Sequence, residues 1–402
     1  MNRTYIFIFG ISDYISGAPI YYANKIRFLE SEGWTVIVLP TDHGKIYIND
    51  LKKYHNLHYE FIKVFPYEYN SKIRQRFVKC LLEQIPSDAE NIIIETGTDY
   101  TSYWGELLAK ELNAKHFIFL LDEDNPRINN YNCNYYKFKY QRGELACITK
   151  KTMIQIFSKF FTIDKPIALR AWCNNSVGFI HTDYCDELKR QKYNIGYVGR
   201  LEKNFVPNII NGIISFAKNV SPDQVMVSLM GGADKNVTTQ ILNKLNAQSN
   251  IHVHCTGYTW PIPYEAVKKC DVCIAGAGSA LVSVHCGVPT IEMDIYRNTP
   301  IGFLTSNEFP SMTSDGANSH DVLFYLNQVL INKNIPKLKP YDFHNEWKAI
   351  ETDFAKQMDY ITKSSIGNQY YDLSQIKLTW KQQIKKILRV TFKCFLLKTK
   401  WM

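Results

Sequence analysis

One turn in the sequence combines small residues with the polar atoms that an anion needs. In IAGAGSALVSVHCGVPTI (274–291), Gly276, Ala277, Gly278 and Ser279 separate an apolar run from a short segment of helical periodicity. Small residues at such a point allow the unpaired N–H groups and the positive dipole end of a helix to approach a phosphate. Ser279 could cap this helix or donate its hydroxyl to the ligand. The chemistry that this turn predicts is phosphate binding.

A second turn, YVGRLEKNF (197–205), places basic residues directly after a glycine. The apolar run ends on Gly199 and is followed by Arg200 and Lys203. A guanidinium fork and a mobile ammonium suit the diphosphate of a nucleotide. The alternative interpretation is a pair of solvated surface charges.

A third turn, GISDYISGAP (10–19), also links an apolar run to a helical segment. It contains Gly10 and Gly17, and Pro19 falls near the first turn of the expected helix. Glycine permits close approach of the backbone to a ligand, and proline is favoured at a helix start. An ordinary flexible turn is the alternative interpretation.

These turns belong to a regular alternation of short apolar runs and amphipathic segments. The runs expected as strands are 5–11, 35–40, 91–95, 116–121, 194–199, 224–230, 251–255, 271–276 and 289–294. Helices are expected near 19–31, 72–84, 101–113, 207–219, 236–246, 263–269 and 279–286. Continuous apolar strands separated by helices are typical of a parallel sheet covered on both faces. We therefore expect an α/β protein with two Rossmann-like, doubly wound domains.

The 402 residues suffice for two such domains with separate cores. No strand is expected after Asp294, only helices near 320–332 and 343–363. The expected division is an N-terminal domain over 1–180, a C-terminal domain over 190–345, a helix over 346–370 that returns toward the N-terminal domain, and a basic tail over 371–402.

Three stretches carry a family resemblance. SGAPIYYANKIRFLESEGWTVIVL (16–39), YVGRLEKNFVPNIINGIISFAK (197–218) and the stretch from IHVHCTGYT (251–259) to GVPTI (287–291) resemble glycosyltransferases of the B-type fold. The resemblance is strongest to the glycogen-synthase-like group that builds capsules and lipopolysaccharides. It covers about residues 5–40 and 193–295.

The resemblance implies two domains that face a central cleft and a nucleotide-sugar donor, UDP- or GDP-linked. It implies neither a metal nor any other cofactor. The implied donor-binding residues are Gly17, Gly199, Arg200, Lys203, Gly257, Gly276, Gly278, Ser279, Ala280 and Glu292. The chain departs from the group at two positions, because the usual donor-site glutamates fall on Ile274 and Val282.

Glycosyl transfer requires stabilisation of the departing diphosphate and, if configuration inverts, a base for the proton of the acceptor. The N-terminal half offers carboxylates where strands are expected to end, namely Asp13, Glu95, Asp99, Asp122 and Asp124. We select Asp13 and Asp99 as the catalytic candidates, because both lie in turns that contain glycine. A helix cap or a surface charge is the alternative role for each. DED (122–124) is only a weak candidate for a metal-binding motif.

Composition limits the location and the partners. Ten cysteines show no repeated pairing, which favours a reducing compartment, and Cys270 and Cys273 lack the second ligand pair of a zinc site. No run of about 18 apolar residues is present, so contact with a membrane would be peripheral. We expect a cytoplasmic protein at the inner face of a membrane.

The basic tail over 371–402 is the segment that we expect to contact the membrane. From Ser374 to the end, the chain has eight lysines and arginines, no acidic residue, and apolar residues at three- and four-residue steps. Such a helix is suited to an anionic membrane surface. Packing against its own protein is the alternative, and nucleic acid is not expected as a partner, because no binding module accompanies the charge.

The function that we expect is transfer of a sugar to a polysaccharide or lipid-linked glycan acceptor during cell-surface glycan synthesis. Two other functions fit the same fold. One is a sugar-nucleotide epimerase, and the other is a non-catalytic nucleotide-sugar-binding subunit of a transferase complex.

Overall fold

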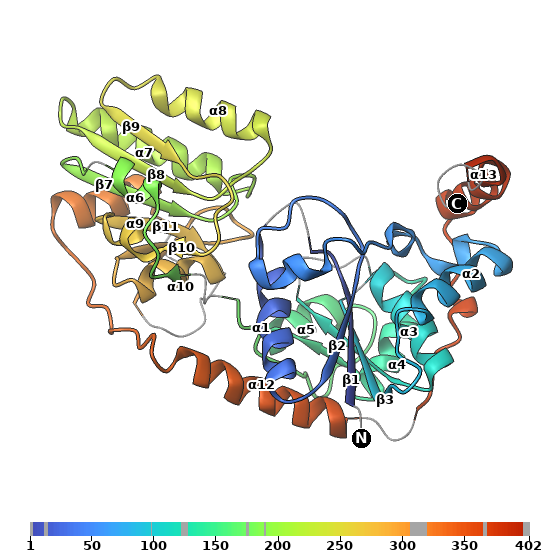
Figure 1. Cartoon of the computed structure of the whole chain (residues 1–402). Coiled ribbons are helices and arrows are strands. Elements are labelled where there is room, and N and C mark those ends of the chain that lie inside the picture. The colour runs from blue at the N-terminus through green and yellow to red at the C-terminus, as the bar shows by residue number, and fades with distance from the viewer. Residues whose placement is uncertain are drawn as a thin grey trace. The chain divides into compact units, whose positions relative to one another are not determined.

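The computed structural model describes residues 3–11, 15–97, 99–121, 128–173, 177–188, 190–305, 320–364 and 368–396 (Figure 1). These residues form two compact units. Unit 1 comprises the described parts of Met1–Asp13, Tyr21–Ala171 and Lys348–Met402, and unit 2 those of Tyr14–Ile20 and Trp172–Trp347. The expected domain ranges had placed the boundary later in the chain, between residues 180 and 190.

Unit 1 is built on a five-stranded parallel sheet in the order β2-β1-β3-β4-β5. Its strands are β1 (Arg3–Phe9), β2 (Thr35–Pro40), β3 (Glu90–Thr96), β4 (Lys115–Leu120) and β5 (Leu145–Cys147). Its α-helices are α1 (Gly17–Ser31), α2 (Ser71–Leu82), α3 (Tyr100–Leu112), α4 (Cys133–Gln141), α5 (Lys150–Phe157), α12 (Glu346–Lys363) and α13 (Trp380–Leu396). Of these, α1 belongs to unit 1 from Tyr21 and α12 from Lys348. The short 3-10 helices are η1 (Asn49–Tyr54), η2 (Glu60–Lys63), η3 (Pro66–Glu68) and η5 (Leu373–Gln375).

Unit 2 is built on a six-stranded sheet in the order β13-β12-β11-β7-β8-β9. Its strands are β7 (Tyr193–Val198), β8 (Val225–Met230), β9 (Ile251–Cys255), β11 (Val272–Gly276), β12 (Thr290–Met293) and β13 (Pro300–Leu304), with a small parallel pair of β6 (Val177–Gly178) and β10 (Ile262–Pro263). Its helices are α6 (Asp183–Glu187), α7 (Val206–Val220), α8 (Lys235–Asn246), α9 (Tyr264–Lys268), α10 (Gly278–His285) and α11 (Val322–Leu326), which continues as the π-helix η4 (Asn327–Ile331).

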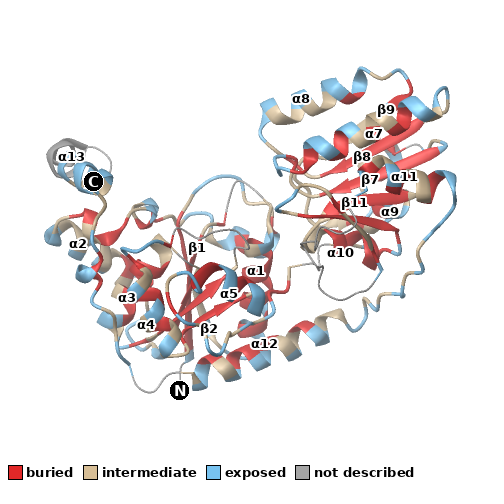
Figure 2. Ribbon diagram, turned by 180° about the vertical axis from the view of Figure 1, so that it is seen from behind, coloured by how far each residue is buried: buried red, intermediate tan, exposed pale blue. Residues whose placement is uncertain are grey.

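The alternation of buried strands and amphipathic helices predicted these two sheets. β7 and β8 are buried along their whole length, as expected for strands covered on both faces (Figure 2). α7 is apolar on the face that packs on this sheet, where Ile209 and Ile213 join the core. The expected fold class of two Rossmann-like units is therefore confirmed.

One prediction about unit 2 is wrong. No strand was expected after Asp294, but β13 (Pro300–Leu304) pairs antiparallel with β12 at the edge of the sheet. Pro300 and Gly302 obscure this strand in the sequence, since both are typical of turns. An edge strand tolerates them because only one of its sides needs a partner.

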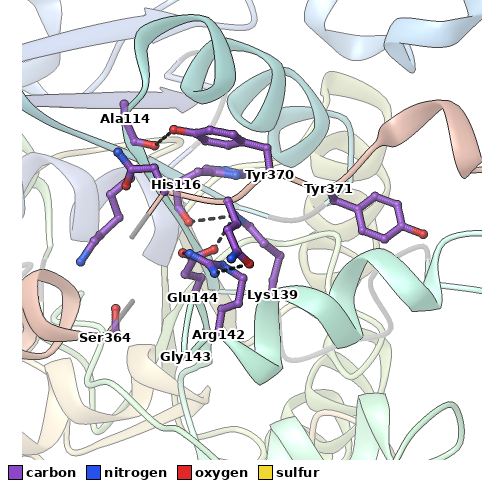
Figure 3. A network of polar contacts seen from close by, with 12 residues as sticks. Ala114, His116, Lys139, Arg142, Gly143, Glu144, Ser364, Tyr370 and Tyr371 are labelled. Carbon is purple, nitrogen blue, oxygen red and sulfur yellow. Dashed lines mark hydrogen bonds and ion pairs between the residues drawn. The ribbon is translucent and has the colours of Figure 1, made fainter. Parts of the chain in front are cut away.

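The polypeptide after α12 is bound to unit 1 by polar contacts. The backbone N–H of Tyr371 donates to Glu106 Oε1 over 2.7 Å, and the Tyr370 hydroxyl donates to the carbonyl of Ala114 over 3.0 Å. Figure 3 shows this region, in which Lys139 lies between Glu144 and the carbonyl of His116. The segment that precedes α13 is thus part of the folded unit.

Candidate functional site

The strand order of unit 2 identifies the edge at which a ligand is expected. β7 lies between β8 and β11, so the chain leaves the sheet in opposite directions after β7 and after β11. Doubly wound sheets bind ligands at the carboxyl ends of strands at such a switch point. The turn with Gly199 follows β7, and the turn with Gly276 and Gly278 follows β11.

Two of the predicted turns meet at this switch point. Gly199 has φ +140°, a conformation that side chains rarely adopt, and a Cβ atom added to it would lie 3.6 Å from Ser279 Oγ. The N–H of Gly199 donates to the carbonyl of Met230 over 3.1 Å, which fixes the turn to the end of β8. Basic residues and a helix start that lie about 80 positions apart in the chain therefore share one edge of the sheet.

Two glycines that sequence reasoning missed, Gly231 and Gly232, allow close backbone approach at this edge. A Cβ atom at Gly231 would lie 1.8 Å from the carbonyl oxygen of Gly199, and one at Gly232 would lie 2.8 Å from the ring of Tyr258. Only glycine allows these backbones to approach so closely. The signal was present in the sequence, because Gly231 and Gly232 directly follow the apolar run 224–230.

Helix α10 begins in strained backbone. Ala277 is its N-cap residue and has φ 52° and ψ −141°, and its side chain makes no capping hydrogen bond. A non-glycine residue in this region costs on the order of 1–3 kcal/mol, and such strain is often found at functional sites. The prediction that Ser279 caps the helix is wrong, because the helix starts at Gly278 and Ser279 lies inside it. The N–H of Ala280 donates to the carbonyl of Ala277 over 3.0 Å, and the N–H groups of Gly278 and Ser279 at the start of the helix receive no side-chain cap from Ala277.

Gly17 and Gly278 lie against the same thiol. A Cβ atom at Gly17 would lie 3.2 Å from Cys173 Sγ, and one at Gly278 would lie 3.5 Å from it. All three residues belong to unit 2, which includes the first residues of α1. Gly17 from the third predicted turn thus lies close to Gly278 in unit 2.

Arg200 and Lys203 follow Gly199 and differ in how far their side chains are exposed. The Arg200 side chain is one-third exposed and lies 3.3 Å from Glu202 Oε1, while its carbonyl accepts a hydrogen bond from the Tyr197 hydroxyl over 2.7 Å. Burial raises the pKa of Tyr197, so this hydroxyl stays protonated and keeps its hydrogen bond. The Lys203 side chain is exposed. Arg200 is the less exposed cation of the two.

The other predicted donor-binding residues differ in their surroundings. Gly257 has φ +64° and open space where a side chain would be, and Gly276 is packed against the ring of Phe205. Ala280 is buried in the core, and its N–H donates to the carbonyl of Ala277 over 3.0 Å. Glu292 lies within β12 and is only 3% exposed, which does not favour contact with a donor sugar.

Unit 1 has the same switch-point arrangement. β1 lies between β2 and β3, and Asp99 follows β3 as the N-cap residue of α3. Its φ of 62° and ψ of −136° repeat the strained conformation of Ala277 in the other unit. Its N–H donates to the Tyr136 hydroxyl over 3.0 Å, and its side chain is partly exposed. Asp13, Asp122 and Asp124 lie outside the described residues.

Glu95 is excluded as a catalytic base by its partners. Its fully buried carboxylate forms an ion pair with Lys25 and accepts hydrogen bonds from the hydroxyls of Tyr5, over 2.5 Å, and Tyr21, over 2.9 Å. These contacts hold α1 and β1 to β3 in the interior of unit 1. Glu95 is therefore structural, a role that its place at the end of an apolar run did not reveal.

Asp42 is an acidic residue at this edge that sequence reasoning missed. Its Oδ1 accepts a hydrogen bond from the N–H of Ile11 over 2.8 Å, and a Cβ atom at Gly10 would lie 2.4 Å from its Oδ2. Asp42 thus orders the start of the glycine turn after β1. Only the parallel pairing of β1 with β2 brings the two turns together.

No metal site is found in the part of the chain that the structure describes, where no group of three or more histidine, cysteine or acidic side chains could hold an ion. Within the same residues, no helix has the length and apolar character required to cross a bilayer.

Comparison with known proteins identifies the fold. No protein-family model matches the sequence, and no curated protein matches it either. Among solved structures, a glycosyltransferase from Rickettsia africae ESF-5 aligns with 99% of this chain and 100% of its own, at a TM-score of 0.51 and 11% identity. The chain has the B-type glycosyltransferase fold. At this identity the match shows the fold alone.

Two further solved structures align less closely with this B-type chain. A UDP-N-acetylglucosamine 2-epimerase matches 92% of this chain and 100% of its own, at a TM-score of 0.49 and 12% identity. A lipopolysaccharide outer core galactosyltransferase matches 98% of this chain and 100% of its own, at a TM-score of 0.45 and 13% identity. Ile274 and Val282, the positions at which the sequence resemblance places two donor-site glutamates, are both buried.

Proposed function

We propose that this protein is a glycosyltransferase that moves a hexose or related sugar from a UDP- or GDP-linked donor to a polysaccharide or lipid-linked glycan in cell-surface glycan synthesis. The observation that carries the proposal is the meeting of Gly199 with Ser279 at the switch point of unit 2. It sets the turn that bears Arg200 beside the start of α10.

This arrangement suits a diphosphate. The N–H groups at the start of α10 and its dipole favour negative charge, and Gly278 leaves the approach free of a side chain. Arg200 adds a fork of donors that can bind two phosphate oxygens at once. Groups fixed in this way stabilise the charge that develops on the leaving nucleoside diphosphate. They need no metal ion to do so.

Asp99 is our candidate for the base that takes the proton of the acceptor. Its carboxylate is partly exposed at the carboxyl end of β3, and its backbone is held in a strained conformation by Tyr136. A base fixed in one position can accept a proton in the transition state without reorganisation. Asp13, the other candidate from the sequence, has no structural support, because it lies outside the described residues.

We place the enzyme in the cytoplasm. The nine cysteines whose side chains the structure describes are free thiols, which suits a reducing compartment. Four of them, Cys185, Cys270, Cys273 and Cys286, are buried in one apolar cluster and act there as small hydrophobic residues.

The test combines binding with turnover. Thermal unfolding of the full chain is measured with UDP, GDP, ADP and CMP, and transfer or hydrolysis is then assayed with sugar donors of the nucleotide that stabilises. We expect one diphosphate to raise the melting temperature, because it binds only the native state. Arg200→Ala should remove both the stabilisation and the activity.

The matched control is Arg190→Ala. Arg190 also forms an ion pair on unit 2, over 2.7 Å to Asp271, but it precedes β7 and so lies at the amino edge of the sheet. Full activity in Arg200→Ala would contradict the donor site. Binding without turnover would favour the non-catalytic subunit, and an epimerised nucleotide sugar as the product would favour the epimerase.

A further inference from the structure

Helix α13 presents apolar side chains to solvent. Trp380, Ile384 and Leu388 are 66%, 47% and 51% exposed, and they follow one another at steps of four residues on one face of the helix. Large apolar side chains grouped in this way are uncommon on a surface that stays in water. We therefore expect a binding partner to cover this face.

The start of α13 is specified by its own sequence. Thr379 Oγ1 accepts a hydrogen bond from the N–H of Gln382 over 3.3 Å, and Gln382 Oε1 accepts one from the N–H of Thr379 over 2.9 Å. This reciprocal pair is a capping box, which fixes where the helix begins. The exposed face is thus the face of a defined helix.

The residues before α13 are bound to unit 1. Leu373 and Ile376 are buried in a core cluster with Leu120 and Leu145, and α13 itself contacts η3. The alternative that the apolar face packs on its own protein does not hold for Trp380, Ile384 and Leu388, since the segment before them is docked and they remain exposed.

The basic residues around this face indicate which kind of partner would bind it. Lys381 and Lys385 are exposed next to the apolar face, and the chain from Ser374 to its end has eight basic residues and no acidic one. A basic rim around a face with tryptophan matches the boundary between anionic headgroups and acyl chains. We propose that α13 lies in the interface of an anionic lipid membrane and attaches unit 1 to it.

This proposal does not depend on the proposed glycosyl transfer. It is tested by flotation of the full chain with vesicles of phosphatidylcholine alone and of phosphatidylcholine with phosphatidylserine. We expect binding only to the anionic vesicles, and weaker binding as salt is raised, because salt screens the charges. Equal binding to neutral vesicles, or none to either, would overturn the proposal.

Two pairs of variants separate charge from apolar contact. Lys381→Glu with Lys385→Glu should reduce binding at least about tenfold, whereas Lys348→Glu with Lys356→Glu makes the same change in charge on α12 and should leave binding intact. Trp380→Ser with Leu388→Ser should abolish binding to the anionic vesicles. Ile331→Ser with Ile335→Ser is the matched control, since these residues are 44% and 58% exposed in unit 2.

Each variant is checked for an unchanged melting temperature, so that loss of binding is not loss of fold. If both control pairs lose binding as strongly as the α13 pairs, the site is not α13. If RNA binds more tightly than anionic vesicles at the same salt concentration, the occupant is a nucleic acid and the membrane proposal fails.

Discussion

The backbone N–H of Asp99 donates a hydrogen bond to the hydroxyl of Tyr136 over 3.0 Å. Tyr136 is fully buried, and burial raises the pKa of its hydroxyl to about 12, so it remains neutral at physiological pH. Asp99 has φ 62°, which for an aspartate must be held in place by its surroundings. The hydroxyl of a buried tyrosine thus helps to fix the position of the proposed base.

Tyr136→Phe should lower kcat about five- to tenfold while leaving KM for the donor unchanged. The change removes one hydrogen bond, worth about 1 kcal/mol, from the strained backbone of Asp99 and keeps the ring in the core. Steady-state kinetics at saturating donor measure the effect. Asp99→Asn is the reference variant and should cost at least about a hundredfold in kcat.

Tyr140→Phe serves as the control, because Tyr140 also accepts a backbone hydrogen bond, over 2.9 Å from Lys165, but makes no contact with Asp99 that the structure shows. If Asp99→Asn is inactive and Tyr136→Phe is fully active, Tyr136 does not position Asp99, although Asp99 is still the base. If Asp99→Asn is itself fully active, Asp99 is not the base.

Ala277→Gly should stabilise the protein by about 1 kcal/mol. Glycine adopts φ 52° and ψ −141° without strain, and this gain exceeds the entropy that glycine loses on folding. Ala280→Gly, three residues later in the same helix, should destabilise by about 1 kcal/mol, because Ala280 is helical and buried. Thermal unfolding of the two variants measures the difference, and destabilisation by both would show that Ala277 carries no strain.

Gly231→Ala and Gly278→Ala should separate a glycine needed for the fold from one needed for the ligand. A Cβ atom at position 231 would lie 1.8 Å from the Gly199 carbonyl oxygen, so unit 2 should lose at least about 2 kcal/mol of stability. A Cβ atom at position 278 would make an ordinary contact of 3.5 Å with Cys173 Sγ, so the fold should tolerate it.

The Gly278→Ala variant should nevertheless lose the stabilisation by nucleoside diphosphate, since its new methyl group occupies the approach to the start of α10. Thermal unfolding with and without the nucleotide measures both effects. A Gly278→Ala protein that still responds fully to the nucleotide would place the phosphate elsewhere.

Unit 1 should lose stability as the pH falls. Burial alone would raise the pKa of Glu106, but its ion pair with Lys139 and its hydrogen bond from His116 lower it to about 2. Burial and the charge of Lys139 lower the pKa of His116, against the effect of Glu106. We assign His116 as neutral, with Nδ1–H donating to Glu106 and Nε2 accepting from the Thr96 hydroxyl.

Both groups bind protons more readily in the unfolded chain, so protonation favours unfolding. The contribution of His116 is present above its unfolded pKa of about 6.5 and falls by about 1 kcal/mol per pH unit below it. That of Glu106 is lost between about pH 4.5 and 2. His116→Gln should therefore unfold with a weaker pH dependence between about pH 7.5 and 5.5, as calorimetry would show. His55→Gln, at an exposed histidine, is the control and should follow the unchanged protein.

The sequence by itself determined most strands of the two sheets, all but β5 and β13, and the turns that follow several of them. Runs such as 194–199 and 224–230 are apolar throughout, and the helices between them repeat with a helical period, so local pattern was enough to predict parallel strands covered on both faces. The glycines of 276–279 marked a strand-to-helix turn for the same local reason. Thr379 and Gln382 likewise specify the start of α13 within four residues of each other.

Only the tertiary structure decided which of these residues meet. Gly231 is required by the backbone of Gly199, Glu95 is neutralised by Lys25, and Asp99 is held by Tyr136, and each pair joins elements that are separate in the chain. The conformation of Ala277 is also set by packing, since alanine does not prefer a positive φ. Periodicity reports which face of an element is buried, whereas the partner on that face depends on the order and register of the strands.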